Sequence, residues 1–219
     1  MTRLGALAAL LCGSTYVFGF AIMATVLGGT GYGASAADPG VIVGFLATHH
    51  GLMSVWTLTI YVVNGLALAA LAIALGAVMQ TDAPTLAPLV RGFGLLWATL
   101  VVAAGLVGNV GLTEVVRLQS IAPEEAARLW QLVHIVETGL GGGNEIAGGV
   151  WALLVAGAAR ASGLLPGPLP WFGGLVGVSG LLTLLPVFTD GAGVVFGLGY
   201  VVWFFWLAAA LSRAPAKGY

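Results

Sequence analysis

Residues 52–79, LMSVWTLTIYVVNGLALAALAIALGAVM, decide the fold class of this chain. The stretch contains no charged residue, and it exceeds the roughly 20 apolar residues that an α-helix needs to cross a bilayer. A helix that is apolar all round is stable only inside a large core or inside a membrane. We therefore predict that residues 52–79 span a membrane.

Similar apolar stretches recur on both sides of this one. Of the 219 residues 59% are hydrophobic and only 7% are charged, whereas ordinary soluble domains carry roughly 25% charged residues. The pattern predicts an all-α, polytopic transmembrane helical bundle of about six spans, forming a single domain over residues 1–219. The spans are expected near 4–29, 52–79, 90–112, 129–158, 170–189 and 192–212, with outer-surface segments at 30–51 and 113–128.

The basic residues predict how the bundle is oriented. Short cytoplasmic loops of membrane proteins carry an excess of Lys and Arg. With the N-terminus inside, most basic residues fall on the cytoplasmic side, and we expect a multi-pass protein of the bacterial inner membrane with both termini cytoplasmic. The residues expected inside are Arg3, Arg91, Arg160, Arg213 and Lys217, and those expected outside are Arg117 and Arg128.

Several classes of function are disfavoured by composition. A formal net charge of −1 with scattered Lys and Arg offers no basic stripe, so we expect no nucleic-acid partner. The single cysteine, Cys12, cannot form a CxxC motif, and we expect a small core residue there. No Ser-His-Asp or metalloprotease spacing is present, although enzymatic activity as such stays open. The expected partners are membrane lipid and, in one alternative, other membrane subunits.

Polar residues inside membrane spans are costly and often mark functional sites, and here they follow helical faces in two spans. Because a polar group facing lipid loses its hydrogen bonds at a cost of several kcal/mol, we expect the two faces to meet around a polar cavity. This cavity should be deepest near Glu145 and should open to the outer face. One face comprises His50, Ser54, Thr57, Tyr61 and Asn64, and the other Trp130, His134, Glu137, Thr138, Gly141, Glu145 and Gly148, with Asn144 at its edge.

The outer ends of these spans carry candidate cofactor ligands. His50, Asn109, His134 and Glu137 are expected in the outer third of the membrane or at its outer interface. Histidines from two antiparallel helices commonly hold haem iron, and His with Glu suits zinc or another divalent metal. We therefore take His50, His134 and Glu137 as candidate cofactor-binding residues, and these three with His49 as candidate metal ligands. Haem and a divalent metal both stay open.

Glu145 is the deepest ionisable residue that the sequence predicts. It follows Asn144, has glycines on both sides, and no Lys or Arg is expected deep in any span. A buried carboxyl without a partner charge tends to be neutral. Glu145 is therefore a candidate proton carrier or ligand-binding group; the alternative is a protonated carboxyl bonded to a neighbouring helix.

Glycines and tryptophans predict how the helices pack. The pairs Gly173/Gly177 and Gly193/Gly197 have the spacing that lets helices approach closely in lipid. The tryptophans fall largely near predicted span ends, where such residues anchor helices at the membrane surface. The expected anchors are Trp130, Trp151, Trp171, Trp203 and Trp206.

Short motifs in the C-terminal part carry a resemblance. They are Gly142-Gly143-Asn144-Glu145 through Trp151, Ala161-Ser162-Gly163-Leu164-Leu165-Pro166, Leu169-Pro170-Trp171 and Gly180-Leu181-Leu182-Thr183-Leu184-Leu185-Pro186. The chain resembles a bacterial family of multi-helix integral membrane proteins known only as a domain of unknown function, which implies a fold and no reaction.

The segment His50-Gly51-Leu52-Met53 is similar to the haem-ligand helix of haem-copper oxidase catalytic subunits. The other oxidase histidines are absent, so the similarity does not imply oxidase activity.

Three functions follow from these patterns. The first is a ligand site between spans 52–79 and 129–158, holding haem or a metal. The second is a non-catalytic accessory subunit of a larger respiratory, photosynthetic or transport complex. The third is a small proton-coupled carrier that uses Asn64, Asn144 and Glu145.

The haem or metal hypothesis predicts a spectroscopic signature. Detergent-purified protein should show a Soret band or a stoichiometric metal, and both His50→Ala and His134→Ala should lose it because each removes one ligand. Absorption spectra and metal analysis of the three proteins measure this. A colourless, metal-free wild-type protein contradicts the hypothesis.

Overall fold

The computed structural model describes residues 1–32, 38–142, 145–165 and 167–214. All regular secondary structure in these residues is helical, which confirms the predicted all-α class. Four helical segments are long and apolar enough to cross a membrane: Thr2–Leu27, His50–Met79, Ala87–Gln119 and Gly191–Arg213. These four correspond to four of the predicted spans.

The helices are joined by short connections, and three segments, η1 to η3, are wider π-type turns. In chain order the elements are α1 (Thr2–Ile22), η1 (Met23–Leu27), α2 (Pro39–Thr48), α3 (His50–Thr57), η2 (Leu58–Val63), α4 (Asn64–Met79), α5 (Ala87–Gln119), α6 (Pro123–Glu137), η3 (Thr138–Gly142), α7 (Ile146–Ser162), α8 (Pro168–Leu182) and α9 (Thr189–Arg213).

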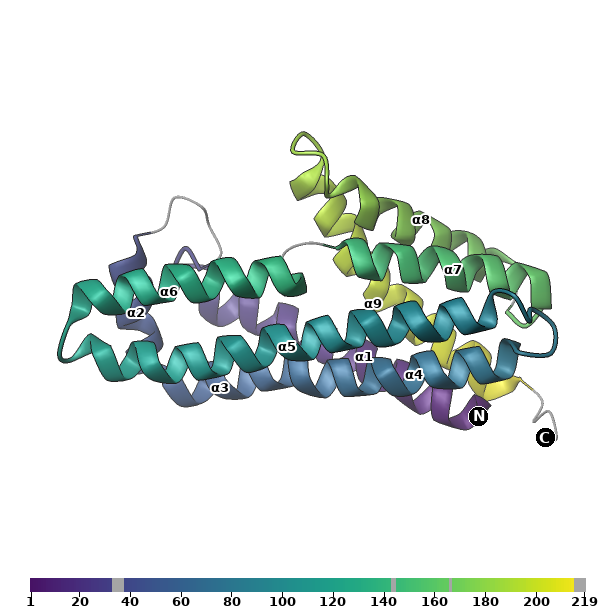
Figure 1. Ribbon diagram of the computed structural model, residues 1–219, viewed down its shortest axis with the longest axis horizontal. Coiled ribbons are helices and arrows are strands. Elements are labelled where there is room, and N and C mark those ends of the chain that lie inside the picture. Colours follow the sequence, from purple (N-terminus) through teal and green to yellow (C-terminus); the bar gives the residue numbers. More distant parts are fainter. Residues whose placement is uncertain (33–37, 143–144, 166, 215–219) are drawn as a thin grey trace.

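Helix α5 sets the long axis of the molecule (Figure 1). Its 33 residues extend for about 50 Å, which exceeds the roughly 30 Å thickness of a bilayer hydrocarbon core. Helix α4 packs along α5, while α6 lies over the C-terminal half of α5 and α7 over its N-terminal half. Helix α1 begins and α9 ends at the same end of this axis (Figure 1).

The helix ends follow local sequence signals. The Asp38 carboxylate caps α2 by accepting a 2.8 Å hydrogen bond from the Gly40 backbone N–H. Helix α6 starts at Pro123, which lacks an amide proton, and has two acidic residues in its first turn. Helix α7 ends at Ser162, and the next residue, Gly163, has a φ of 63° that is favourable for glycine.

The prediction of one continuous span over residues 129–158 is wrong. Helix α6 ends at Glu137, and the η3 turn that follows contains Gly141, whose φ of 125° and ψ of 13° are non-helical. Helix α7 then begins at Ile146. The face predicted to run from Trp130 to Gly148 does not form, because the chain changes direction between the two helices. Figure 1 shows α6 and α7 as separate helices on either side of this break.

Aromatic residues build the larger of two cores, and this corrects the prediction that most tryptophans are surface anchors. Trp151 and Trp203 are fully buried, and the Trp151 indole donates a 2.9 Å hydrogen bond to the Val90 carbonyl of α5. Trp130 is also buried, in a second core formed with α2, α3 and the C-terminal half of α5. Trp171 does match the prediction: it is 64% exposed and lies 4.0 Å beneath the Arg160 guanidinium.

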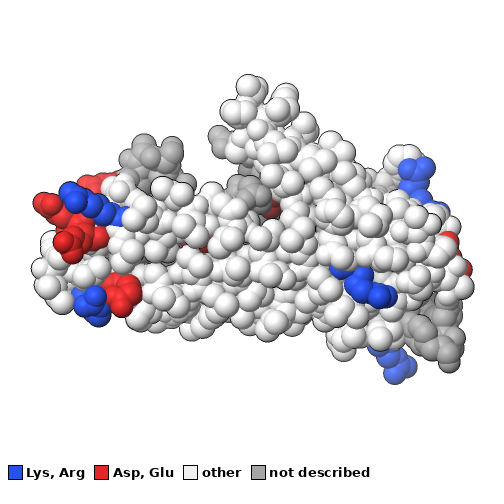
Figure 2. Space-filling view, in the orientation of Figure 1, with Lys and Arg blue, Asp and Glu red and all other residues white. Residues whose placement is uncertain are grey.

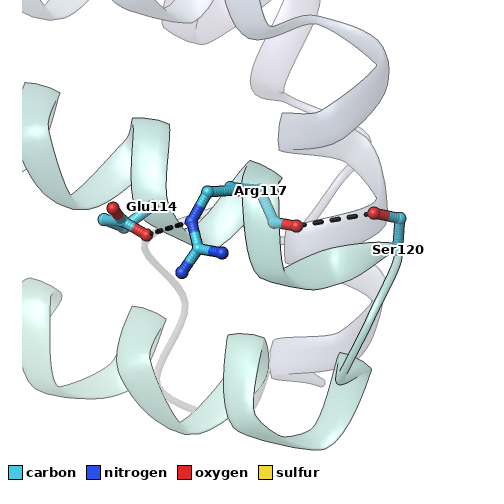
Figure 3. Close-up of polar contacts among 3 residues, drawn as sticks. All are labelled: Glu114, Arg117 and Ser120. Carbon is cyan, nitrogen blue, oxygen red and sulfur yellow. Dashed lines mark hydrogen bonds and ion pairs between the residues drawn. The ribbon is translucent and has the colours of Figure 1, made fainter.

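On the face shown in Figure 2, most charged side chains lie toward the two ends of the long axis, and only small parts of acidic side chains are visible between them. Glu114 and Arg117 lie near the C-terminal end of α5, where an exposed ion pair of 2.7 Å joins them (Figure 3). The Ser120 hydroxyl donates to the Arg117 carbonyl in the same turn. Exposed pairs of this kind stabilise a fold by only about 0–1 kcal/mol. Their position is therefore more informative than their energy, because it marks one polar end of the molecule.

Glycine permits a close backbone contact between α7 and α8. A Cβ atom at Gly177 would lie 2.8 Å from the Gly149 carbonyl oxygen, and a Cβ atom at Gly149 would lie 2.8 Å from the Gly177 carbonyl oxygen. Gly173 faces Trp203 of α9 at a similarly short distance, and Gly197 faces Phe20 of α1. Gly173, Gly177 and Gly197 each admit an adjacent helix, as the sequence predicted.

Replacing Gly177 by Ala should destabilise the protein by about 1–3 kcal/mol, because its methyl group would overlap the α7 backbone. Gly174→Ala is the matched control in the same helix, since a Cβ atom there meets nothing within 4 Å. Thermal unfolding in detergent, followed by tryptophan fluorescence, measures the difference. Equal melting temperatures for the two variants would contradict the close contact.

Candidate ligand site inside the helix bundle

A cavity of about 240 Å³ lies where the chain breaks between α6 and α7. Residues from α1, from the continuous α3–η2–α4 helix, from α5 and from α9 form its walls, and the break itself contributes the only carboxyl among the described lining residues. The lining residues are Thr15, Tyr16, Gly19, Phe20, Met23, Trp56, Ile60, Tyr61, Asn64, Trp97, Val101, Gly141, Glu145, Gly193, Phe196 and Gly197.

The break in the chain positions Glu145. Its backbone carbonyl accepts the first hydrogen bond of α7, 2.8 Å from the Gly149 N–H, so the residue is tied to the start of that helix. Its side chain does not cap α7 but lines the cavity. On the other side the Glu145 carbonyl lies where a Cβ atom on Gly180 would be only 2.8 Å away, so α8 packs tightly against this turn.

The charge around Glu145 is unbalanced. None of the described residues that line the cavity is Lys, Arg or His. An ionised carboxylate in such surroundings is costly unless a proton or another cation neutralises it. Six aromatic residues line the same space: Tyr16, Phe20, Trp56, Tyr61, Trp97 and Phe196. The site therefore combines one acidic group with several aromatic residues.

Asn64 connects two walls of the cavity. Its amide nitrogen donates a 2.7 Å hydrogen bond to the Thr15 hydroxyl, which in turn donates to the Cys12 carbonyl at 2.8 Å. The residue is buried, and these bonds turn its side chain toward α1 rather than toward the helix predicted over 129–158. Cys12 is fully buried beside it, as expected for a small core residue.

A second carboxyl, Glu137, lies buried outside this cavity. It borders a space of about 10 Å³ that is also lined by Thr57 of α3 and by Tyr32 and Trp130. Gly108 of α5 lies beside it, since a Cβ atom there would be in ordinary contact, 3.5 Å from the Glu137 carboxyl carbon. A space of this size holds about one water molecule.

His134 lies next to Glu137 on α6. Its Nδ1 atom is 3.7 Å from the nearer carboxylate oxygen, which is longer than a direct hydrogen bond. The ring stacks on Trp130, one turn earlier, with centroids 5.8 Å apart. The His134 side chain is 44% exposed, whereas that of Glu137 is 7% exposed. The predicted spacing of these two residues does bring them together on one face.

Tyr61 lines the larger cavity together with Glu145. Its position depends on Gly105 of α5, because a Cβ atom at Gly105 would lie only 2.4 Å from the Tyr61 Cβ atom. The η2 turn, which includes Tyr61, is wider than an α-helix, and such turns are frequent at functional sites.

The remaining candidate residues lie elsewhere. His49 is exposed, stacks on Phe45 and is within 2.9 Å of the Thr48 hydroxyl, while the Nε2 atom of His50 is buried without a hydrogen-bond partner. Asn109 donates a 3.2 Å hydrogen bond to the Ser54 carbonyl, linking α5 to α3. Within the described part of the chain, no three His, Cys, Asp or Glu side chains group as ligands for a metal ion. Asn144 lies outside the described residues.

The sequence predicted part of this site. Tyr61, Asn64, Gly141 and Glu145 meet in the larger cavity, whereas Thr57 and Glu137 border the smaller one. The residues from α1, α5 and α9 were missed because aromatic residues in apolar helices do not differ from ordinary core residues. Thr15 alone carried a weak signal, as a polar residue inside the first apolar stretch.

No protein-family model matches the chain, and neither the curated proteins nor the solved structures contain a significant match. The resemblance to the bacterial family of unknown function stays a prediction. The functional argument therefore depends on the site itself.

The Asn64–Thr15 hydrogen bond should couple α4 to α1. Asn64→Leu and Thr15→Val should each destabilise the protein by about 1 kcal/mol, because both helices lose the same buried bond. The double variant should cost less than the sum of the two. Unfolding by dodecyl sulfate in mixed micelles measures all three free energies, and strict additivity would show that the two side chains do not interact.

Proposed function

We propose that this chain is a multi-pass protein of the bacterial inner membrane that binds a small organic cation with an apolar body in the cavity beside Glu145. The observation that carries the proposal is one carboxyl in a space lined by six aromatic residues and by no described basic residue. Cations are attracted to the faces of aromatic rings, and aromatic cages recognise quaternary ammonium groups in this way. A carboxylate in the same cage adds the opposite charge.

The distribution of charge supports an orientation with both termini in the cytoplasm. Arg3 begins α1, Arg91 lies near the start of α5, and Arg160 and Arg213 lie in the last turns of α7 and α9. These helix ends share one end of the long axis (Figure 1). The opposite end carries Glu114, Glu124 and Glu125 with two arginines, so the basic excess favours the terminal end as cytoplasmic.

The size of the cavity limits the ligand. A volume of about 240 Å³ is slightly below the roughly 300–1,000 Å³ of typical ligand pockets, so one ring with a compact charged group is the expected scale. The polar groups beside the carboxyl are the hydroxyls of Thr15, Tyr16 and Tyr61 and the amide of Asn64. They suit a ligand with few hydrogen-bonding groups of its own.

The other functions predicted from the sequence have weaker support. A haem or metal site at His50, His134 and Glu137 would need ligands that converge. Of these three residues, His134 and Glu137 lie close to each other. A proton-coupled carrier is compatible with a cation site at Glu145, because a carboxyl exchanges a proton for a cation. An accessory-subunit function has no specific contact in its favour.

Binding of benzyltrimethylammonium tests the proposal, because its fixed charge cannot be lost by deprotonation. Detergent-purified protein should bind this cation, and Glu145→Gln should weaken binding by about 100-fold, since the carboxylate is the only acidic group in the described cavity wall. Isothermal titration calorimetry measures both affinities.

Two controls make the result specific. Neopentylbenzene has the same shape without the charge, and it should bind the wild type and Glu145→Gln equally. Glu114→Gln removes an exposed carboxylate at the end of α5 and should leave cation binding unchanged. If the wild-type protein binds the cation no better than Glu145→Gln does, the proposed function is wrong.

A further inference from the structure

We propose that the cation bound beside Glu145 is a single-chain amphiphile that enters from the outer leaflet of the membrane. Its charged head occupies the cavity, and its alkyl tail passes between α1 and α9 and stays in the bilayer. This inference rests on the proposed function and narrows the class of ligand to cationic amphiphiles with one chain.

The cavity is open on one side. Of the described residues that line it, only Phe20 and Met23 are exposed, by 40% and 39%, whereas the others are buried or half-buried. Gly193 of α9 also lines the cavity, and a Cβ atom there would meet nothing within 4 Å. The opening therefore lies between the C-terminal part of the α1–η1 segment and the start of α9.

The same two helices are closed along the rest of their contact. One turn after Gly193, a Cβ atom at Gly197 would lie 2.9 Å from the Phe20 ring. Near the other end of the pair, a Cβ atom at Gly5 would lie 3.1 Å from the Leu211 side chain. The gap between α1 and α9 is therefore confined to the end of the pair that borders the cavity.

The rim of the opening is apolar. Phe20 and Met23 form its α1 side, and the exposed residues that follow Gly193 on α9 are Val194 and Val195. Both helices belong to segments that are long and apolar enough to cross a membrane. An apolar opening between two such segments suits contact with lipid chains rather than with water.

The opening lies at the level of lipid headgroups. At 1.5 Å per residue, Phe20 is about 27 Å from Thr2 at the start of α1, and Gly193 is about 30 Å from Arg213 at the end of α9. The start of α1 and the end of α9 lie at the same end of the long axis (Figure 1). Because the hydrocarbon core of a bilayer is about 30 Å thick, the proposed orientation places the opening near its outer boundary.

An amphiphile fits both the size of the cavity and the position of the opening. The space of about 240 Å³ accommodates a compact charged head but not a long chain as well. A tail that leaves through the opening remains among lipid chains, so binding does not expose its carbons to water. The head starts at the level at which amphiphiles carry their charge, and it moves sideways to reach Glu145.

Two cations with the same benzylammonium head test the inference. Benzyldodecyldimethylammonium differs from benzyltrimethylammonium by a dodecyl chain in place of one methyl group. Wild-type protein in lipid nanodiscs should bind both, and Glu145→Gln should weaken both. Equilibrium dialysis against empty nanodiscs separates binding to the protein from partition into lipid.

Gly193→Phe places a large side chain in the opening, where a Cβ atom has space. It should weaken binding of the tail-bearing cation by at least about tenfold and that of benzyltrimethylammonium by less than about twofold. Met23→Trp narrows the opening from the α1 side and should act in the same way. Gly191→Phe is the matched control: a Cβ atom there also meets nothing within 4 Å, but Gly191 is not among the residues that line the cavity.

The outcomes separate this inference from the proposed function. The inference is overturned if Gly193→Phe and Met23→Trp bind the tail-bearing cation as the wild type does, or if they lose both cations equally. It also fails if the wild type binds benzyltrimethylammonium but not the tail-bearing cation. In all three cases the proposed function stands, whereas binding that does not depend on Glu145 rejects the proposed function as well.

Discussion

The interruption of the helix between Glu137 and Ile146 is the constraint on which the candidate site depends. Gly141 adopts a backbone conformation that side chains with a Cβ atom rarely adopt, and the chain therefore leaves the direction of α6 at that point. Glu145 is the N-cap residue of α7 and lines the cavity. Breaks of this kind within a membrane are tolerated where the backbone is buried in protein or borders a cavity.

Close helix contacts supply the rest of the architecture. Helices in lipid gain little from hydrophobic burial against each other, so they associate by packing at short distance. Here Gly149 and Gly177 let the backbones of α7 and α8 meet, and Gly105 lets the Tyr61 backbone lie against α5. Glycines also face large buried rings, since Gly94 of α5 lies against Trp151 and Gly173 of α8 lies against Trp203.

The two carboxyls occupy different surroundings, since Glu137 is buried whereas Glu145 is only partly buried. Glu145 borders a larger aromatic space, whereas Glu137 borders a space of about one water molecule and lies next to a partly exposed histidine.

The sequence alone determined the helical class and four of the membrane-compatible segments. These features follow from apolar length and composition, which are properties of each segment by itself. It also identified Glu137, Glu145, Tyr61 and Asn64 as the polar residues that require an explanation, because apolar helices rarely carry such groups.

Only the tertiary structure decided which of these residues meet. A helical wheel assumes a straight helix. The backbone is not helical at Gly141, so Glu137 and Glu145 do not lie on one helical face. Asn64 turned toward Thr15 of α1 because a hydrogen bond forms with whichever helix packs nearest, and spacing along one chain segment does not reveal its neighbour. For the same reason the burial of Trp151 and Trp203, and the contribution of α9 to the cavity, depended on contacts between segments far apart in the sequence.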